Sequence, residues 1–334
     1  MTKERIAYFD VLRTLACLMI IIMHAPMPNI GGNSYVLSSI SMLTAPGIGL
    51  FFMVSGALLL PVRSSQTDFL KHRLSKILFP TLFWTLFYLA VRLFDVNILP
   101  EELPKKILSI PFSPQGHNVL WFMYTLTGLY LISPIISPWL EKASKREIEL
   151  MLGIWIITLL FPMLNDILKV NESKTGMLYY FTGYAGYFLL GYYFKRFVNN
   201  PSTTLLALLF VIPIGTAVFI KTMHIDINFY KRFWYLCIFA AMMASGWFLM
   251  VKKYAINYAS SIISHFSKCS FGIYLAHIFV MRRILWRMDF ISSHGSIAQI
   301  IMTVVLTVII SYTLVTLISK LPYAEYIIGY KDRK

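Results

Sequence analysis

Long apolar stretches recur along the whole sequence and are separated by short polar segments. Each is about 17–25 residues long, the length at which an α-helix crosses the hydrocarbon layer of a bilayer. The pattern predicts about ten membrane-spanning helices, at 8–27, 46–62, 77–95, 119–138, 149–168, 177–195, 203–221, 233–251, 269–287 and 297–319. The second span can begin as early as Tyr35, and it then breaks at Ala45-Pro46-Gly47. We therefore expect an all-α, polytopic integral membrane protein.

The composition supports this fold class and excludes a soluble protein. Hydrophobic residues make up 57% of the chain and charged residues only 13%, whereas a soluble domain has roughly 25% charged residues. No low-complexity linker divides the sequence, so we expect a single membrane domain over residues 1–334. Asp10 and Arg13 interrupt the first apolar stretch, which therefore lacks the form of a removable signal peptide.

The distribution of Lys and Arg predicts the orientation of the chain. With both termini in the cytoplasm, the inner loops carry more Lys and Arg than the outer loops, as the positive-inside rule requires. Anionic lipid explains the net charge of +15, so we expect membrane lipids as partners and no nucleic acid. Cys17, Cys237 and Cys269 lie in apolar segments without paired spacing. They indicate neither a disulfide framework nor a metal site.

Three ionisable residues fall on one stripe of the first span. At 100° per residue, Asp10, Arg13 and His24 share a helix face, and Arg13 and His24 are about 16 Å apart along the axis. Ionisable groups inside a bilayer are costly and mostly functional. Asp10 and Arg13 offset part of that cost if they pair near the inner interface, whereas His24 must face a polar cavity or another helix. The alternative is a structural ion pair and a buried histidine that a carbonyl satisfies.

Several motifs of the sequence occur together, and in the same order, in a known family. Besides D-x-x-R-x(10)-H in the first span, they are GLFFMVSGALL (49–59), FLKHRLSKILFP (69–80), LWFMYTLTGLYLISPII (120–136) and SFGIYLAHIFV (270–280). By these motifs the chain resembles the membrane acyltransferase-3 family. That family includes bacterial enzymes that O-acetylate surface polysaccharides and the intercellular-adhesin modification proteins.

The resemblance implies an enzyme that uses acetyl-CoA. Such an enzyme transfers an acyl group, most commonly acetyl, from cytoplasmic acyl-CoA to a hydroxyl of a surface or lipid-linked glycan. It implies a bacterial cytoplasmic membrane as the location and proteins of polysaccharide synthesis as partners. Some members carry an appended hydrolase-like domain, which we do not expect here because the chain ends at Lys334. The acceptor sugar and the choice between acetyl and a larger acyl group stay open.

The resemblance also suggests which residues bind the donor. Arg13, Arg73, Lys76 and Lys71 would hold the phosphates of CoA at the cytoplasmic entrance, because Arg and Lys are the usual phosphate ligands. Lys76 stands where the family has a second arginine. Lys71, Arg73 and Lys76 have an alternative interpretation, as the positive charge that is usual at the cytoplasmic end of a membrane span.

His24 is the expected catalytic residue. A neutral imidazole can remove the proton of a sugar hydroxyl at physiological pH, either for direct transfer or through an acyl-histidine intermediate. Donors for the negative charge on the carbonyl oxygen are expected among Ser55, Asn118 and Tyr124.

Two positions of the motifs, one tryptophan and one histidine, have two interpretations each. Trp121 is either an interfacial anchor or part of the substrate wall. Tyr274 and His277 share a helix face, and His277 either lines the cavity or only joins two helices by a hydrogen bond. The family often has a histidine directly before Leu-Trp-Phe, but here that position is Val119, and His117 stands two residues earlier.

A transporter is the main rival function, as a polysaccharide exporter or flippase. Transporters are often built from internal repeats with matching broken helices. The sequence shows no second copy of D-x-x-R-x(10)-H, so we rank acyl transfer first, transport second and a membrane scaffold third.

Overall fold

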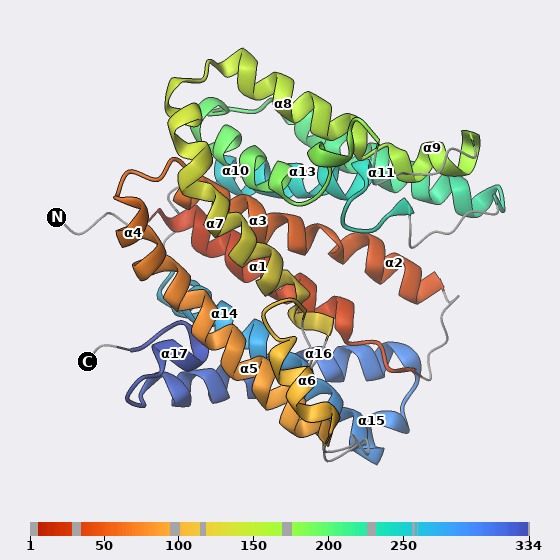
Figure 1. Cartoon of the computed structure of the whole chain (residues 1–334). Coiled ribbons are helices and arrows are strands. Elements are labelled where there is room, and N and C mark those ends of the chain that lie inside the picture. The colour runs from red at the N-terminus through yellow and green to blue at the C-terminus, as the bar shows by residue number, and fades with distance from the viewer. Residues whose placement is uncertain are drawn as a thin grey trace.

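The computed structural model describes residues 6–28, 35–93, 101–113, 118–168, 176–225, 232–255, 258 and 260–332. In these ranges the regular structure is helical and contains no strand, which confirms the all-α fold (Figure 1). The long helices form one bundle in which α1 and α3 lie between two groups of helices, with α8, α10 and α13 on one side and α5, α14 and α16 on the other.

The α-helices of the bundle are α1 (Ala7–His24), α2 (Tyr35–Thr44), α3 (Pro46–Leu59), α4 (Gln66–Phe69), α5 (Ser75–Leu93), α6 (Glu102–Leu108), α7 (Trp121–Lys142), α8 (Lys145–Thr158), α9 (Phe161–Leu168), α10 (Ala185–Phe197), α11 (Thr203–Thr222), α13 (Ile238–Tyr254), α14 (Ser261–Phe279), α15 (Asp289–Ser292), α16 (Ser296–Ser319) and α17 (Glu325–Ile328). Two π-helical turns, η2 (Leu70–Leu74) and η5 (Val280–Ile284), adjoin α5 and α14. Short 3-10 turns lie at Asn118–Leu120, Tyr179–Phe181 and Leu285–Arg287.

Six helical stretches are long and apolar enough to cross a membrane. Within the described residues they are Ala7–His24, Val36–Leu59, Gln66–Leu93, Lys145–Leu164, Thr203–Thr222 and Ser296–Ser319. The protein is therefore a multi-pass membrane protein, while the expected number of ten spans stays a prediction. The second stretch begins in α2 and changes helix at Ala45, as the Ala45-Pro46-Gly47 signal predicts.

Two predicted spans have wrong boundaries. The span at 177–195 is helical only from Ala185, because Gly183, with φ of 94°, turns the chain just before α10. The span at 269–287 begins eight residues earlier, at Ser261, where the Ser260 hydroxyl caps the helix by accepting from the Ile263 N–H. Its last predicted residues form the π and 3-10 turns after Phe279.

Helix α16 shows that the bundle is adapted to lipid. Its buried positions are largely polar, namely Gln299, Thr303, Thr307, Ser311 and Ser319. Its exposed positions are largely apolar, and they include Ile297, Ile301, Val305, Ile309 and Leu317. A helix in water would bury the apolar face, so this inverted pattern indicates an apolar surrounding.

Glycines bring the central helices into backbone contact. A Cβ added at Gly56 of α3 would lie 1.8 Å from the Phe188 carbonyl oxygen of α10, and one at Gly191 would lie 1.9 Å from the Met53 carbonyl oxygen. A Cβ at Gly47 would lie 2.8 Å from the Met19 Cβ of α1. Gly47, Gly56 and Gly191 therefore serve close helix packing, and they bring α1, α3 and α10 together at the centre of the bundle.

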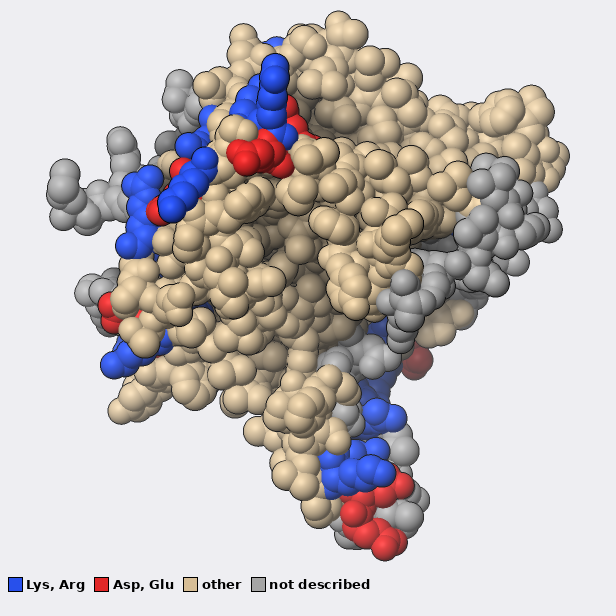
Figure 2. Space-filling model, turned by 45° about the horizontal axis from the view of Figure 1, so that its top comes forward, with Lys and Arg blue, Asp and Glu red and all other residues tan. Residues whose placement is uncertain are grey.

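Charge gathers at two ends of the molecule. Figure 2 shows Lys, Arg, Asp and Glu at one edge and at a projecting end, with a broad uncharged face between them. The start of α1 and the end of α17 lie on the same side (Figure 1). The three cysteines are all buried, as small core residues.

Candidate active site

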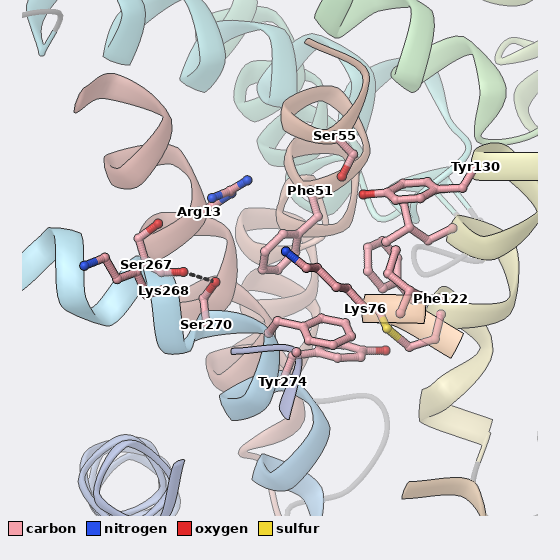
Figure 3. A pocket seen from close by; sticks show the side chains of 15 residues that line it. Arg13, Phe51, Ser55, Lys76, Phe122, Tyr130, Ser267, Lys268, Ser270 and Tyr274 are labelled. Carbon is pink, nitrogen blue, oxygen red and sulfur yellow. Dashed lines mark hydrogen bonds between the residues drawn. The ribbon is translucent and has the colours of Figure 1, made fainter. Parts of the chain in front are cut away.

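A cavity of about 220 Å³ opens at the end of the bundle where α1 begins, and Figure 3 shows the side chains around it. Helices α1, α3, α5, α7 and α14 contribute to its wall. We call it the cation pocket. Its polar or aromatic lining residues are Arg13, Phe51, Ser55, Lys76, Phe122, Tyr130, Ser267, Lys268, Ser270, Phe271 and Tyr274.

Three cations line this pocket from three different helices. Arg13 comes from α1, Lys76 from α5 and Lys268 from α14. The Lys268 ammonium points away from the other two (Figure 3), so two positive charges, those of Arg13 and Lys76, face the cavity and are suited to a phosphate group. The structure thus brings together two of the four residues that the sequence suggested for the donor.

The other two predicted cations lie elsewhere. Arg73 lines a neighbouring cavity of about 380 Å³ together with Arg63 and Lys195. Lys71 is exposed and lines neither cavity. In a regular α-helix Arg73 and Lys76 would share a face, but the π-helical turn η2 covers Arg73 and holds more residues per turn. The two side chains are therefore directed into different cavities.

Tyr130 lies between the two cavities. Its ring packs against Phe69 of the second cavity at 6.2 Å between centroids, and its hydroxyl points toward Ser55 in the cation pocket (Figure 3). Arg13 and Arg73 both act electrostatically on Tyr130. The two cation clusters are thus neighbours around one phenol ring.

Asp10 joins α1 to α14 below the pocket. The Ser267 hydroxyl donates a hydrogen bond of 2.8 Å to the Asp10 Oδ1, and the Ser270 hydroxyl donates to the Ser267 carbonyl (Figure 3). Asp10 is only 6% exposed. The carboxylate therefore has a partner from another helix, and its expected pairing with Arg13 stays a prediction.

His24 lies at the far end of α1 and meets a second histidine. Its Nδ1 is 2.9 Å from the Ile20 carbonyl oxygen and 3.4 Å from the Nε2 of His277 in α14. The Nδ1 of His277 is in turn 2.5 Å from the Tyr274 carbonyl oxygen. His24 thus contacts a residue of another helix, as expected for a functional histidine in a membrane. It also contacts a backbone carbonyl, as expected for a structural histidine.

Tyr274 connects the cation pocket with this histidine pair. Its ring lines the pocket, and the Tyr274 and His277 ring centroids are 5.6 Å apart. The Tyr274 hydroxyl donates to the Val119 carbonyl, which fixes the ring against the start of α7. One aromatic side chain therefore separates the pocket from the histidines.

Trp121 belongs to an aromatic wall inside the protein. Its ring contacts Tyr184 and Tyr235 at 5.0 and 5.6 Å between centroids. The Tyr235 hydroxyl reaches the sulfur of Met23 at 3.3 Å, next to His24. These contacts place Trp121 beside the end of α1 and favour the wall interpretation over that of an interfacial anchor.

Two of the three expected oxyanion donors can be placed. Ser55 lines the cation pocket with Arg13. The Tyr124 hydroxyl is buried next to Thr85 of α5. The side chain of Asn118 lies outside the described residues, as does His117.

The sequence argument missed Ser267, Lys268 and Tyr130. A signal for the first was present, because positions 267, 270 and 274 follow the helical period into the motif that begins at Ser270. The sequence argument also did not single out Arg282 of η5, whose charge is close enough to act electrostatically on His24.

The comparisons with known proteins identify the family of the chain. The model of the acyltransferase domain of the acyltransferase-3 family matches residues 6–316, which include Arg13, His24 and His277. No curated protein and no solved structure matches the chain. The match covers most of the chain, and the chain therefore belongs to the acyltransferase-3 family, as a multi-pass membrane acyltransferase.

Proposed function

We propose that the protein transfers an acyl group, acetyl in the simplest case, from cytoplasmic acyl-CoA to a hydroxyl of a surface or lipid-linked glycan. His24 is the general base in this proposal. The observation that carries it is the arrangement of the Arg13 pocket and the His24–His277 pair at two levels of one helix, with Tyr274 between them.

The cation pocket suits the anionic end of the donor. Arg13 and Lys76 would hold phosphates of CoA, and Arg73 with Arg63 and Lys195 would serve a second phosphate group in the neighbouring cavity. The Lys and Arg distribution favours the cytoplasm for this end. The apolar pantetheine arm would then extend along α1 over the roughly 16 Å from Arg13 to His24.

The hydrogen bonds of His24 leave one nitrogen for chemistry. A carbonyl oxygen only accepts, so the Nδ1 that contacts the Ile20 carbonyl carries a hydrogen. In the neutral ring the other nitrogen, Nε2, has an unshared electron pair. This is the tautomer that a base at Nε2 needs.

One histidine can carry out both proton transfers of the reaction. The Nε2 of His24 removes the proton of the acceptor hydroxyl while its oxygen attacks the thioester carbonyl carbon. The C–S bond then breaks, and the same proton passes from Nε2 to the departing sulfur, which gives CoA thiol and the O-acyl sugar. Direct transfer needs no covalent enzyme intermediate, and Arg282 is the charged neighbour that would stabilise negative charge near His24.

The first experiment measures transfer across the membrane. Inside-out vesicles from a bacterial host that makes the acceptor glycan but does not itself acetylate it would receive acetyl-labelled acetyl-CoA, and the label in the carbohydrate fraction would be compared for wild type, His24→Ala and His24→Gln. We expect loss by a factor of roughly 10² or more in both variants, because neither side chain is a base. Full labelling by either variant would exclude His24 as the base.

A second intramembrane histidine provides the matched control. His265 also lies in α14, where its Nδ1 is 2.7 Å from the Tyr312 hydroxyl, outside both cation-lined cavities. His265→Gln should retain most of the labelling. If the protein were an exporter, no label would enter the glycan in any variant. His24→Gln could then keep transport, because it could preserve a polar path.

A further inference from the structure

Two imidazoles from distant parts of the chain meet inside the protein. His24 ends α1, and His277 lies in α14, with the Nδ1 of the first 3.4 Å from the Nε2 of the second. The ring centroids are 5.3 Å apart at an angle of 51°. His277 is 0% exposed, so its side of this contact is buried in the protein.

The carbonyl contacts determine where the hydrogens are. The Nδ1 of His277 lies 2.5 Å from the Tyr274 carbonyl oxygen, so this nitrogen also carries a hydrogen. The Nε2 of His277 faces an Nδ1 that already bears one. Two N–H groups directed at each other would repel, so the Nε2 of His277 must be the acceptor and His277 must be neutral.

This arrangement has a consequence for the charged form of His24. When His24 takes a proton at Nε2, its Nδ1–H becomes a stronger donor, and a hydrogen bond from a charged group is shorter and about twice as strong as a neutral one. The 3.4 Å contact is long for the resting state, and apo contacts of this kind commonly tighten in the reacting complex.

We propose that His277 is a positioning residue that, together with the Ile20 carbonyl, holds the His24 ring and shares its Nδ1 hydrogen, so that it stabilises the His24 imidazolium during acyl transfer. The inference rests on the proposed role of His24 and extends it. His277 itself does not touch the acyl group, and it stays neutral throughout the reaction. It acts as the third group that orients a base in catalytic triads, with a neutral imidazole in place of a carboxylate.

The helix that carries His277 is held firmly in place. The Tyr88 hydroxyl of α5 donates to the Leu275 carbonyl and accepts from the Phe279 N–H, two residues to either side of His277. The Tyr274 hydroxyl is bound to the Val119 carbonyl. His277 is therefore fixed from both ends, as a positioning group must be.

The test compares an apolar and a polar replacement of similar size. His277→Leu removes the acceptor, whereas the amide of His277→Gln can accept from His24 and donate to the Tyr274 carbonyl. We expect His277→Leu to lower kcat for label transfer by roughly 10- to 100-fold, because a hydrogen bond to a charged group is lost. KM for acetyl-CoA should change less than twofold, and His277→Gln should recover most of kcat.

A double variant tests whether His277 acts through His24. In the His24→Ala background, His277→Leu should cause no further loss of the residual rate, since the group that it positions is gone. Equal kcat in the Leu and Gln variants, or an independent second loss in the double variant, would overturn the inference.

A spectroscopic measurement needs neither substrate nor active enzyme. Nitrogen-15 spectra of histidine-labelled protein in lipid nanodiscs distinguish protonated from bare ring nitrogens, and His24→Ala assigns the His24 signals. We expect a protonated Nδ1 and a bare Nε2 in wild type. In His277→Leu the hydrogen should stay on Nδ1, because the Ile20 carbonyl remains, while the Nδ1 signal shifts through loss of the second acceptor. An Nε2-protonated His24 in wild type would refute the inference even if His24 proves essential. Full activity of His24→Ala would instead refute the proposed function.

Discussion

Gly56→Ala should separate two central helices of the bundle. The Cβ of the new alanine would lie 1.8 Å from the Phe188 carbonyl oxygen and 2.9 Å from the Phe188 Cα. Real Cβ contacts essentially never fall below 3.0 Å, so α3 and α10 must move apart by about 1.2 Å. The obstructing atoms belong to the backbone and cannot turn away as a side chain would.

The expected cost follows from overpacking. Forcing an extra carbon into a well-packed core costs about 1–3 kcal/mol, occasionally more, and a backbone obstacle puts Gly56→Ala at the upper end of that range. Alanine recovers up to about 1 kcal/mol through its higher helix propensity. The net destabilisation should still be about 2 kcal/mol. Because α3 also carries Phe51 and Ser55 into the cation pocket, acetyl-CoA binding should weaken as well.

Thermal unfolding of the purified protein in detergent measures this effect. Gly128→Ala in α7 is the matched control, because a Cβ there meets nothing within 4 Å. We expect the Tm of Gly56→Ala to lie about 5 °C or more below that of Gly128→Ala, at about 2–4 °C per kcal/mol. Equal Tm values for the two variants would refute the close approach of α3 and α10.

Three further substitutions test the donor pocket and its supports. Arg13→Gln should raise KM for acetyl-CoA about tenfold or more by removing a charged phosphate ligand, while Lys105→Gln on the distant α6 leaves KM unchanged in the same vesicle assay. Ser267→Ala removes a donor to the buried Asp10 carboxylate, so the protein should lose about 1–3 kcal/mol of stability, seen as a lower Tm that Ser267→Thr restores. Lys252→Met should cost about 3 kcal/mol in the same melting assay, because the Lys252 ammonium donates to three carbonyls at the C-terminal end of α10.

The sequence was a good guide to features that depend on local chemistry. Apolar length predicts α1, α11 and α16, because a helix that spans lipid must satisfy its own backbone. Proline after Ala45 predicts the change from α2 to α3. Helical periodicity puts Asp10, Arg13 and His24 on one face, and the membrane environment marks them as functional.

The sequence was a poor guide where turns depart from the α-helix. Arg73 and Lys76 are three residues apart, and a regular helix would direct both into one site. The π-helical turn η2 separates them into two cavities. The hydrogen-bond pattern that widens a helical turn has no strong local sequence signal, so only the structure reveals it.

The sequence by itself determined that this is a membrane protein of helices with an ionisable first span, because these properties follow from residue type and spacing. Only the tertiary structure decided what meets that span. Lys268 joins Arg13 in one pocket, and His277 reaches His24 across 253 residues of chain. Such contacts depend on how α1 and α14 pack against each other, and that packing is fixed by the shape of many side chains together rather than by any single motif.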